Sequence, residues 1–278
     1  DLKGIEYNEY WGDLNGRKLN SRIKEVAEPI VMLNHYWAFS EKATLQTNAS
    51  YQFGKIGNSR LDFNGGANPS PTYYQTLPSY FLRDNDLAGA YTAQENVVNK
   101  GQLDWQRIFD ANTTNANVGL NNAYVLYEDR NDDKQITVNT IYNLDVNNHI
   151  AINGKVEYKR LRSHNFAEVI DLLGGSGYLD INNFADSEAQ MQNDVLNPNR
   201  IVGVGDAFRY NFNLSSDLIN AFLQAQFKYS KIDFFGAVKV SQVTNQREGF
   251  YKNGRFENNS LGASEKINFT NYGAKAGA

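Results

Sequence analysis

The chain has 278 residues and a net charge of −4, with 41% hydrophobic and 13% aromatic residues. Its mean hydropathy is −0.57, and it has no run of about 18 apolar residues, so a helical membrane protein is excluded. A membrane β-barrel is still possible, because only alternate residues of its strands face lipid. The chain contains no cysteine, which excludes disulfides, thiolate metal sites and cysteine catalysis, and it has no block of Lys and Arg, so we expect no nucleic-acid partner.

The segment from Pro29 to Gly54 predicts a β-hairpin with a tight turn at residues 40–42. Its second arm alternates, with polar side chains at every even position from 44 to 52. The odd positions carry Ala43, Leu45, Thr47, Ala49, Tyr51 and Phe53. Successive strand side chains point to opposite faces, so one face is apolar and the other polar. Three aromatic residues precede the turn: Tyr36, Trp37 and Phe39. Such rings beside an alternating strand are typical of a membrane–water interface.

The segments around this hairpin look irregular. We expect Asp1–Ser21 to be a loop, and Pro29, which cannot donate to a ladder, to mark an edge or a bulge. Residues 55–122 are rich in turn residues and predict a long loop, with one short helix at Trp105–Ala111. A strand fragment at 123–128 is then interrupted by the charged run Glu128–Lys134.

Two further hairpins follow. Residues 136–146 and 150–158 alternate around a turn at Asn147-Asn148, and residues 208–229 and 237–243 flank a turn at 230–233. Between them we expect an irregular stretch with a short helix at Asn165–Leu173, ended by Gly174-Gly175. A shift of parity at Ser215–Asp217 predicts a bulge. A loop from about 246 to 264 leads to the last strand.

Short turns therefore alternate with long loops three times, as in membrane barrels with short periplasmic turns and long outer loops. This orients the turns at Ser40, Asn147 and Ser230 toward the periplasm. About seven strands are predicted, too few for a closed bacterial barrel, which has an even number from eight upward. The first ten residues lack a signal-peptide pattern, and residues 268–278 look like a strand without its turn. We therefore expect an all-β, antiparallel, partial transmembrane barrel that belongs to a larger one.

Several segments resemble the barrel region of TonB-dependent outer-membrane receptors of Bacteroidetes-type bacteria, the SusC-related group with a carboxypeptidase-regulatory-like domain. The matching stretches are LNSRIKEVAEPIVMLNHYWAFSEKATL, NPSPTYYQTLPSYF, DLLGGSGYLDINNFAD, VLNPNRIVGVGDAFRY, KIDFFGAV and SEKINFTNYGAKAGA. They are spread from about Leu19 to Ala278. Together they indicate that residues 1–278 are one part of such a barrel, with neither the plug domain nor the TonB box.

The resemblance implies a barrel of 22 strands in the outer membrane, surrounded by lipid and filled by a plug. It implies active uptake of a glycan, a peptide or a metal chelate. The TonB complex would act through the missing N-terminal part, and a SusD-like surface lipoprotein is a further partner found with some relatives. No G-x-S-x-G, H-E-x-x-H or P-loop motif appears in the sequence, so we expect no enzymatic activity and no cofactor.

Aromatic residues in the long loop are the candidate ligand-binding residues. They are Tyr73, Tyr74, Tyr80 and Trp105, which with Phe81 would offer a stacking surface for a glycan or a peptide. The alternative, which we favour, is that they pack the loop onto itself, because a loop of this length needs a small core of its own.

Other motifs give weaker indications of a functional site. Asp129–Asp133 opens like a calcium loop, but Lys134 and Thr140 occupy the positions of the glycine and the closing glutamate, so we favour a solvated hairpin tip. The three histidines, His35, His149 and His164, lack ligand spacing and are expected at the surface or the membrane interface. Loop carboxylates suited to glycoside hydrolysis show no pairing pattern: Asp104, Asp110, Glu168, Asp171 and Asp180.

Two other functions stay open. A secreted, soluble β-rich module that binds carbohydrate would bury the apolar strand faces in one core. An extracellular hydrolase on a β scaffold is a further alternative, although no nucleophile–base pair stands out. Replacing Leu45 or Val138 by Arg separates the first alternative from the barrel, because only a lipid-facing position loses membrane assembly.

Overall fold

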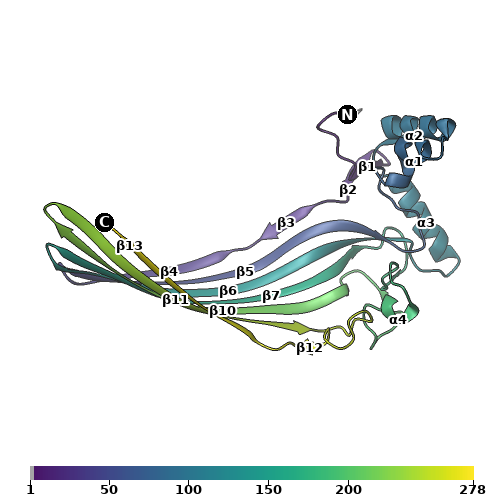
Figure 1. Cartoon of the computed structure of the whole chain (residues 1–278). Helices are drawn as coiled ribbons and strands as arrows, with labels where there is room; N and C mark the ends of the chain where they lie inside the picture. The colour runs from purple at the N-terminus through teal and green to yellow at the C-terminus, as the bar shows by residue number, and fades with distance from the viewer. Residues whose placement is uncertain (1–2) are drawn as a thin grey trace.

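The computed structural model describes residues 3–278 and consists mainly of one long, curved antiparallel sheet (Figure 1). Strands hold 54% of the residues and helices 14%, so the all-β prediction is confirmed. The sheet has nine strands, of which seven are long and follow one another in chain order. They are β4 (Ile30–Ser40), β5 (Ala43–Phe63), β6 (Tyr124–Asn147), β7 (Ile150–Asp171), β10 (Ala207–Tyr229), β11 (Ile232–Gly249) and β13 (Ile267–Gly277).

The sheet is open. Its first edge is formed by β4 together with the short strand β3 (Lys24–Ala27), because both pair with β5. The other edge is formed by β13 and the two-residue strand β12 (Gly262–Ala263), which both pair with β11. Pro29 lies between β3 and β4 on the first edge, as predicted. Within residues 3–278 the two edges do not meet.

Short turns and long connections lie at opposite ends of the sheet (Figure 1). Two residues join β4 to β5, β6 to β7 and β10 to β11, so the three predicted short turns are confirmed. The end of the sheet that carries them is called the turn end, and the opposite end, where the helices gather, the loop end. Among the described residues, no helix is both long and apolar enough to cross a membrane.

The loop end contains more regular structure than the sequence predicted. The expected loop 1–21 contains a hairpin of β1 (Trp11–Leu14) and β2 (Arg17–Asn20), although residues 1 and 2 lie outside the described chain. The predicted helix at Trp105 is confirmed and is longer, as α3 (Trp105–Asn117). The loop prediction missed α1 (Pro78–Leu82) and α2 (Leu87–Lys100). The remaining short elements are η1 (Tyr74–Thr76), β8 (Tyr178–Leu179), α4 (Glu188–Met191) and β9 (Ile201–Val202).

Three local predictions are wrong. The segment Asn165–Leu173 is not a helix, because β7 continues to Asp171 between two partner strands. The charged run Glu128–Lys134 does not interrupt β6 and is no hairpin tip, since Arg130 forms an ion pair with Glu168 on β7. The β10 irregularity lies between Phe208 and Asn211, whereas pairing through 215–217 is regular.

The buried core lies at the loop end. One cluster packs β8 and β9 against β6, β7 and β10 and consists of Val125, Tyr127, Ala167, Val169, Tyr178, Val202 and Phe208. A second joins α3 to the start of β6 and consists of Leu103, Trp105, Ile108, Ala123, Tyr124 and Leu173. The buried Asn112 of α3 donates to the Tyr124 carbonyl (2.9 Å) and accepts from its N–H (3.0 Å). It thereby satisfies backbone groups that the end of β6 leaves unpaired.

Candidate functional site

The half of the sheet nearer the turn end, called the turn half, has one apolar and one polar face. Pairing places one row of side chains on the same face: Trp37, Leu45, Tyr142, Leu223 and Val238, with Gly154 between Tyr142 and Leu223. The next row on that face holds Thr47, Thr140, Val156, Ala221, Val240 and Tyr272. We call this the apolar face. The opposite, polar face carries Gln46, Asn48, Asn139, Glu157, Asn220 and Ser241.

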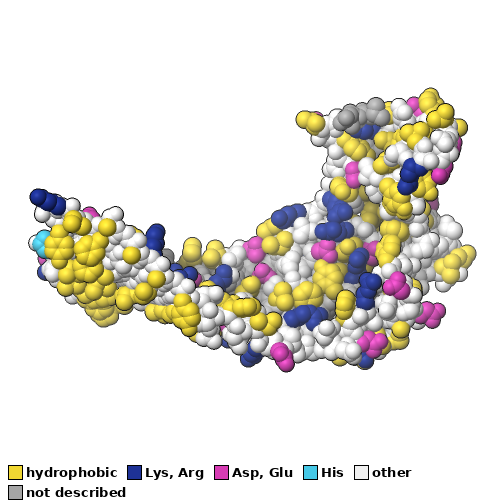
Figure 2. Space-filling view, viewed as in Figure 1, with side chains coloured by type: hydrophobic (Ala, Val, Ile, Leu, Met, Phe, Trp, Pro, Cys, Tyr) yellow, Lys and Arg dark blue, Asp and Glu magenta, His cyan; other side chains and the backbone are white. Residues whose placement is uncertain are grey.

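The apolar face is uncovered. Large side chains across it are about half exposed, including Val156 (58%), Leu223 (52%) and Val238 (57%). Figure 2 shows hydrophobic side chains gathered toward the turn end and charged side chains toward the loop end. A soluble monomer rarely exposes so large a continuous apolar surface, so a face of this kind marks contact with a membrane or a partner.

Aromatic rings border the apolar face. Near the turns, Trp37 lies 4.1 Å from Phe39 and Phe227 lies 4.7 Å from Phe234, measured between ring centroids. On the side toward the loop end, Tyr51 stacks on Phe53 at 5.2 Å. Rings in two such bands are typical of membrane interfaces.

Charged groups lie in the same cross-strand rows as Tyr51 and Phe53. Arg160 Nε lies 2.8 Å from Asp217 Oδ1, and Arg162 lies 3.1 Å from Asp217 Oδ2. Lys134 occupies the same cross-strand row as Arg162. The apolar face therefore ends in a row of charges, as a lipid-facing surface does at the headgroup level.

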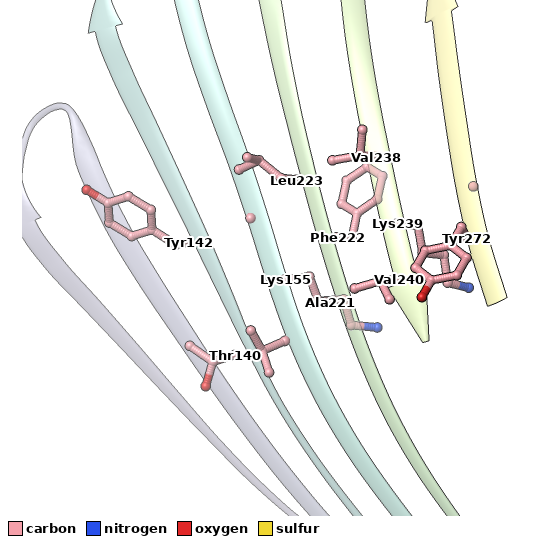
Figure 3. Close-up of a pocket in the computed structure, with 13 residues that line it drawn as sticks. Thr140, Tyr142, Lys155, Ala221, Phe222, Leu223, Val238, Lys239, Val240 and Tyr272 are labelled. Carbon is pink, nitrogen blue, oxygen red and sulfur yellow. The ribbon is translucent and has the colours of Figure 1, made fainter. Parts of the chain in front are cut away.

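A groove of about 600 Å³ lies at the centre of the apolar face (Figure 3). Its walls include Tyr142, Val156, Leu223, Val238, Val240 and Tyr272. The groove exists because Gly154 contributes no side chain between Tyr142 and Leu223. A Cβ atom built on Gly154 would lie 3.8 Å from Leu223 Cδ1, which is an ordinary contact.

A second, more polar hollow lies at the loop end, where β10 meets residue 193 and the segment 247–260. Its volume is about 400 Å³, and a smaller hollow of about 200 Å³ shares Asn193, Arg209 and Tyr210 with it. The larger hollow is lined by four aromatic rings, five amide or hydroxyl side chains and two guanidinium groups: Asn193, Arg209, Tyr210, Asn211, Phe212, Arg247, Tyr251, Asn253, Phe256, Asn259 and Ser260.

A buried carboxylate organises this hollow. Asp180 is almost fully buried and accepts hydrogen bonds from Arg200 (2.6 Å), Asn193 (2.8 Å) and the Arg209 N–H (2.9 Å). The Arg209 backbone has a φ of 61°, which this N–H bond helps to hold. Three charged or polar partners compensate the burial of the charge. The rings and amides that line the hollow suit a polar ligand with apolar faces, such as a sugar or a peptide.

Tyr178, the first residue of β8, lies beside this network. Burial raises the pKa of Tyr178, and the neighbouring Asp62 carboxylate raises it further. The side chain is therefore kept neutral over the ordinary pH range. It packs edge-on to Phe208, with 6.0 Å between ring centroids.

The structure brings together three of the four predicted ligand-binding residues. Tyr73 and Tyr74 lie 4.9 Å apart, Tyr74 and Tyr80 lie 5.9 Å apart, and the Arg83 guanidinium lies over the Tyr80 ring at 4.7 Å. Trp105 lies elsewhere, only 1% exposed in the second core cluster, where its indole donates to the Leu19 carbonyl (3.1 Å). It packs the loop, and ligand binding by the tyrosines stays a prediction.

The carboxylates of the run that opens like a calcium loop have protein partners. Asp129 accepts from the Tyr210 hydroxyl (2.8 Å) and pairs with Arg60 (2.7 Å), and Asp132 pairs with Arg130 (2.9 Å). No metal-holding group of three or more His, Cys, Asp or Glu side chains occurs in residues 3–278.

The candidate catalytic carboxylates also have local partners. Asp104 caps α3 by accepting from the Arg107 N–H (3.0 Å), and Asp171 accepts from the Leu173 N–H (2.7 Å). Gly174 follows the β7 strand rather than a helix and has a φ of 84°. Each of these groups therefore has a structural use.

The histidines lie far apart. His149 stacks on Tyr229 beside a short turn (5.0 Å), and His164 stacks on Phe166 (4.4 Å). His35 lies on the edge strand β4, opposite Thr47.

The residues of the polar hollow escaped the sequence analysis. Arg209, Tyr210, Arg247 and Tyr251 come from strands or from strand ends, and their spacing shows no motif. The density of Asn and aromatic residues in 249–259 was the one available signal.

A comparison with models of known protein families found no match, and a search of curated proteins also found none.

Proposed function

We propose that this chain forms part of the wall and the outer loops of an outer-membrane β-barrel, and that this barrel is a TonB-dependent receptor. The observation that carries the proposal is the exposed apolar face, which extends across the long strands of a sheet whose other face is polar. Alternation of this kind, with lipid on one side and a polar lumen on the other, is the signature of membrane barrels.

The dimensions of the apolar face support the proposal. On β10 the face runs from Ile219 to Phe227, between Asp217 at one end and the turn at the other. A membrane strand needs about 9–11 residues at a tilt of about 45°, and this segment falls in that range. β10 continues beyond Asp217 toward the loop end, as strands do when a barrel wall extends into outer loops.

The two open edges support a larger closed barrel. Within the described part of the chain, β4 and β13 each offer eleven residues with one unpaired side. Edges of this length invite uncontrolled pairing, and closure removes them. Further strands on both edges, up to the 22 that the resemblance implies, would satisfy these backbone groups.

The loop end would then be the ligand-capturing side. The polar hollow and the cluster of Tyr73, Tyr74 and Tyr80 both lie there and suit a glycan or a peptide. Uptake would use the TonB complex through a plug domain, and a SusD-like lipoprotein would cover the loops. Lipid of the outer membrane would surround the apolar face.

Fractionation of the native cells tests the proposal, followed by gel migration of the outer-membrane fraction with and without boiling. We expect the protein in that fraction, migrating faster when unheated, because a closed barrel stays compact in detergent. Recovery of the protein from the soluble fraction without detergent would refute the barrel. The soluble carbohydrate-binding module would then be the better explanation, with a second layer over the apolar face.

A further inference from the structure

We infer that the apolar face holds one anionic lipid in a fixed place, with its phosphate at Lys134, Arg160 and Arg162 and one acyl chain in the groove at Gly154. These three residues are called the basic cluster. The inference rests on the proposed function, because a lipid reaches this face only if the face lies in a membrane.

The charge of the basic cluster suits a phosphate headgroup. Arg160 and Arg162 both pair with Asp217, and Lys134 lies opposite Arg162. Together with that one carboxylate, the basic cluster carries a net charge of +2. The Arg160 and Arg162 side chains are 49% and 40% exposed, so both guanidinium groups reach the surface. Guanidinium forks bind phosphate oxygens in pairs. The ion pairs to Asp217 orient both arginines without neutralising the cluster.

The groove and the basic cluster are aligned along one strand. Gly154 and Arg160 are both on β7 and on the same face, six residues apart, with Val156 and Tyr158 between them. Six residues of strand span about 20 Å, which at a tilt of about 45° corresponds to about 14 Å of depth. This is close to half of a hydrocarbon core of about 30 Å. The groove then lies near the bilayer midplane and the cluster at the headgroups, as a lipid of one leaflet requires.

The choice of glycine at position 154 points to an occupant. Glycine weakens a strand and usually marks a bulge or the close approach of another group. Pairing is regular on both sides of Gly154, and a Cβ there would meet only ordinary contacts. The backbone therefore does not require glycine. The residue keeps the groove open, and the apolar walls suit an acyl chain (Figure 3).

Lipid binding by the full-length protein tests the inference. The assembled protein, purified from the outer membrane, is placed in phosphatidylcholine nanodiscs with a minor share of phosphatidylglycerol, and the phosphatidylglycerol that it retains is counted by native mass spectrometry. Each basic group near an anionic headgroup contributes about fivefold in affinity. We expect Arg162→Gln to weaken retention about fivefold and Asp217→Asn to strengthen it about fivefold. Lys159→Gln is the matched control, since Lys159 lies on the polar face of the same strand.

A second pair of variants tests the groove. Gly154→Phe fills it and should reduce retention severalfold. Gly236→Leu, on the same face but outside the groove, should leave retention unchanged, because a Cβ there meets no atom within 4 Å.

The outcomes separate the two proposals. If the wild-type protein is absent from the outer membrane, the proposed function fails and the lipid site with it. If the protein is a heat-modifiable barrel in the outer membrane but Arg162→Gln and Lys159→Gln retain lipid equally, only the lipid site is refuted. A loss of retention with Asp217→Asn would also refute it, since removal of a negative charge must favour an anionic headgroup.

Discussion

Leu223→Arg is the sharpest test of a lipid-facing surface. Leu223 belongs to the central strand β10 and lies across from Gly154 and Val238 in the middle row of the apolar face. Its side chain is 52% exposed when nothing covers the sheet. The cost of a charge at this position therefore depends almost entirely on whether water or lipid surrounds it.

The two environments predict very different magnitudes. On a water-exposed surface, a substitution of this kind changes the free energy of unfolding by no more than about 0.5 kcal/mol. At the midplane of a bilayer, an arginine on the lipid face of a barrel costs about 2–4 kcal/mol. Ile219 lies four residues nearer the loop end on the same face, so Ile219→Arg should cost less, because the penalty falls toward the interface.

The assay is refolding of the full-length protein into lipid vesicles over a series of urea concentrations, with the folded fraction read from its faster gel migration. Gln224→Arg is the matched control, because Gln224 is the next residue and points to the polar face. We expect the order of destabilisation Leu223→Arg, then Ile219→Arg, then Gln224→Arg. Equal stability of the Leu223 and Gln224 variants would refute the assignment of lipid to this face.

Three further predictions concern the loop end. Trp105→Ala should lower the free energy of unfolding of the α3 region, measured by hydrogen exchange, by about 3–5 kcal/mol. Tyr74→Ala, at an exposed position, should change this free energy little. Equal effects of the two substitutions would contradict the core assignment of Trp105. Asn112→Ala leaves buried backbone groups of β6 unpaired and should cost about 1–3 kcal/mol, visible as faster proteolysis between α3 and β6. The exposed Asn117→Ala on the same helix is the control. Because the folded-state pKa of Tyr178 is raised, its contribution to stability is complete below the unfolded pKa of about 10 and is lost as pH rises toward the folded pKa. Thermal unfolding between neutral and alkaline pH should therefore show a smaller alkaline decline in Tyr178→Phe than in wild type, and identical declines would contradict this.

The turn half of the sheet was predictable from the sequence because its determinants are local. Side chains alternate with a period of two, so the odd residues from Ala43 to Phe53 had to share one face once the segment was a strand. Two-residue connections between alternating segments leave the chain few options other than a hairpin. These turns fixed the pairing within each of the three hairpins. The pairing of β5 with β6, β7 with β10 and β11 with β13 across the long connections came only from the structure.

The loop half depended on partners distant in the sequence. Residues 165–173 looked like a short helix ended by Gly174-Gly175, yet β6 and β10 on either side complete the hydrogen bonds of a strand. The charged run on β6 looked like a break because Glu168, the partner of Arg130, is 38 residues away in the chain.

The candidate sites also contain features that the sequence predicts and features that only the structure shows. The alternation of residues along each strand by itself determined that one face is apolar, and the sequence also placed aromatic rings near the turns. Only the tertiary structure decided that Gly154 opens a groove between Tyr142 and Leu223, and that Trp105 is buried. It also assembled the polar hollow from three separate segments. The physical reason is that periodicity records which way a side chain points, whereas a cavity depends on which strands and loops are packed beside it.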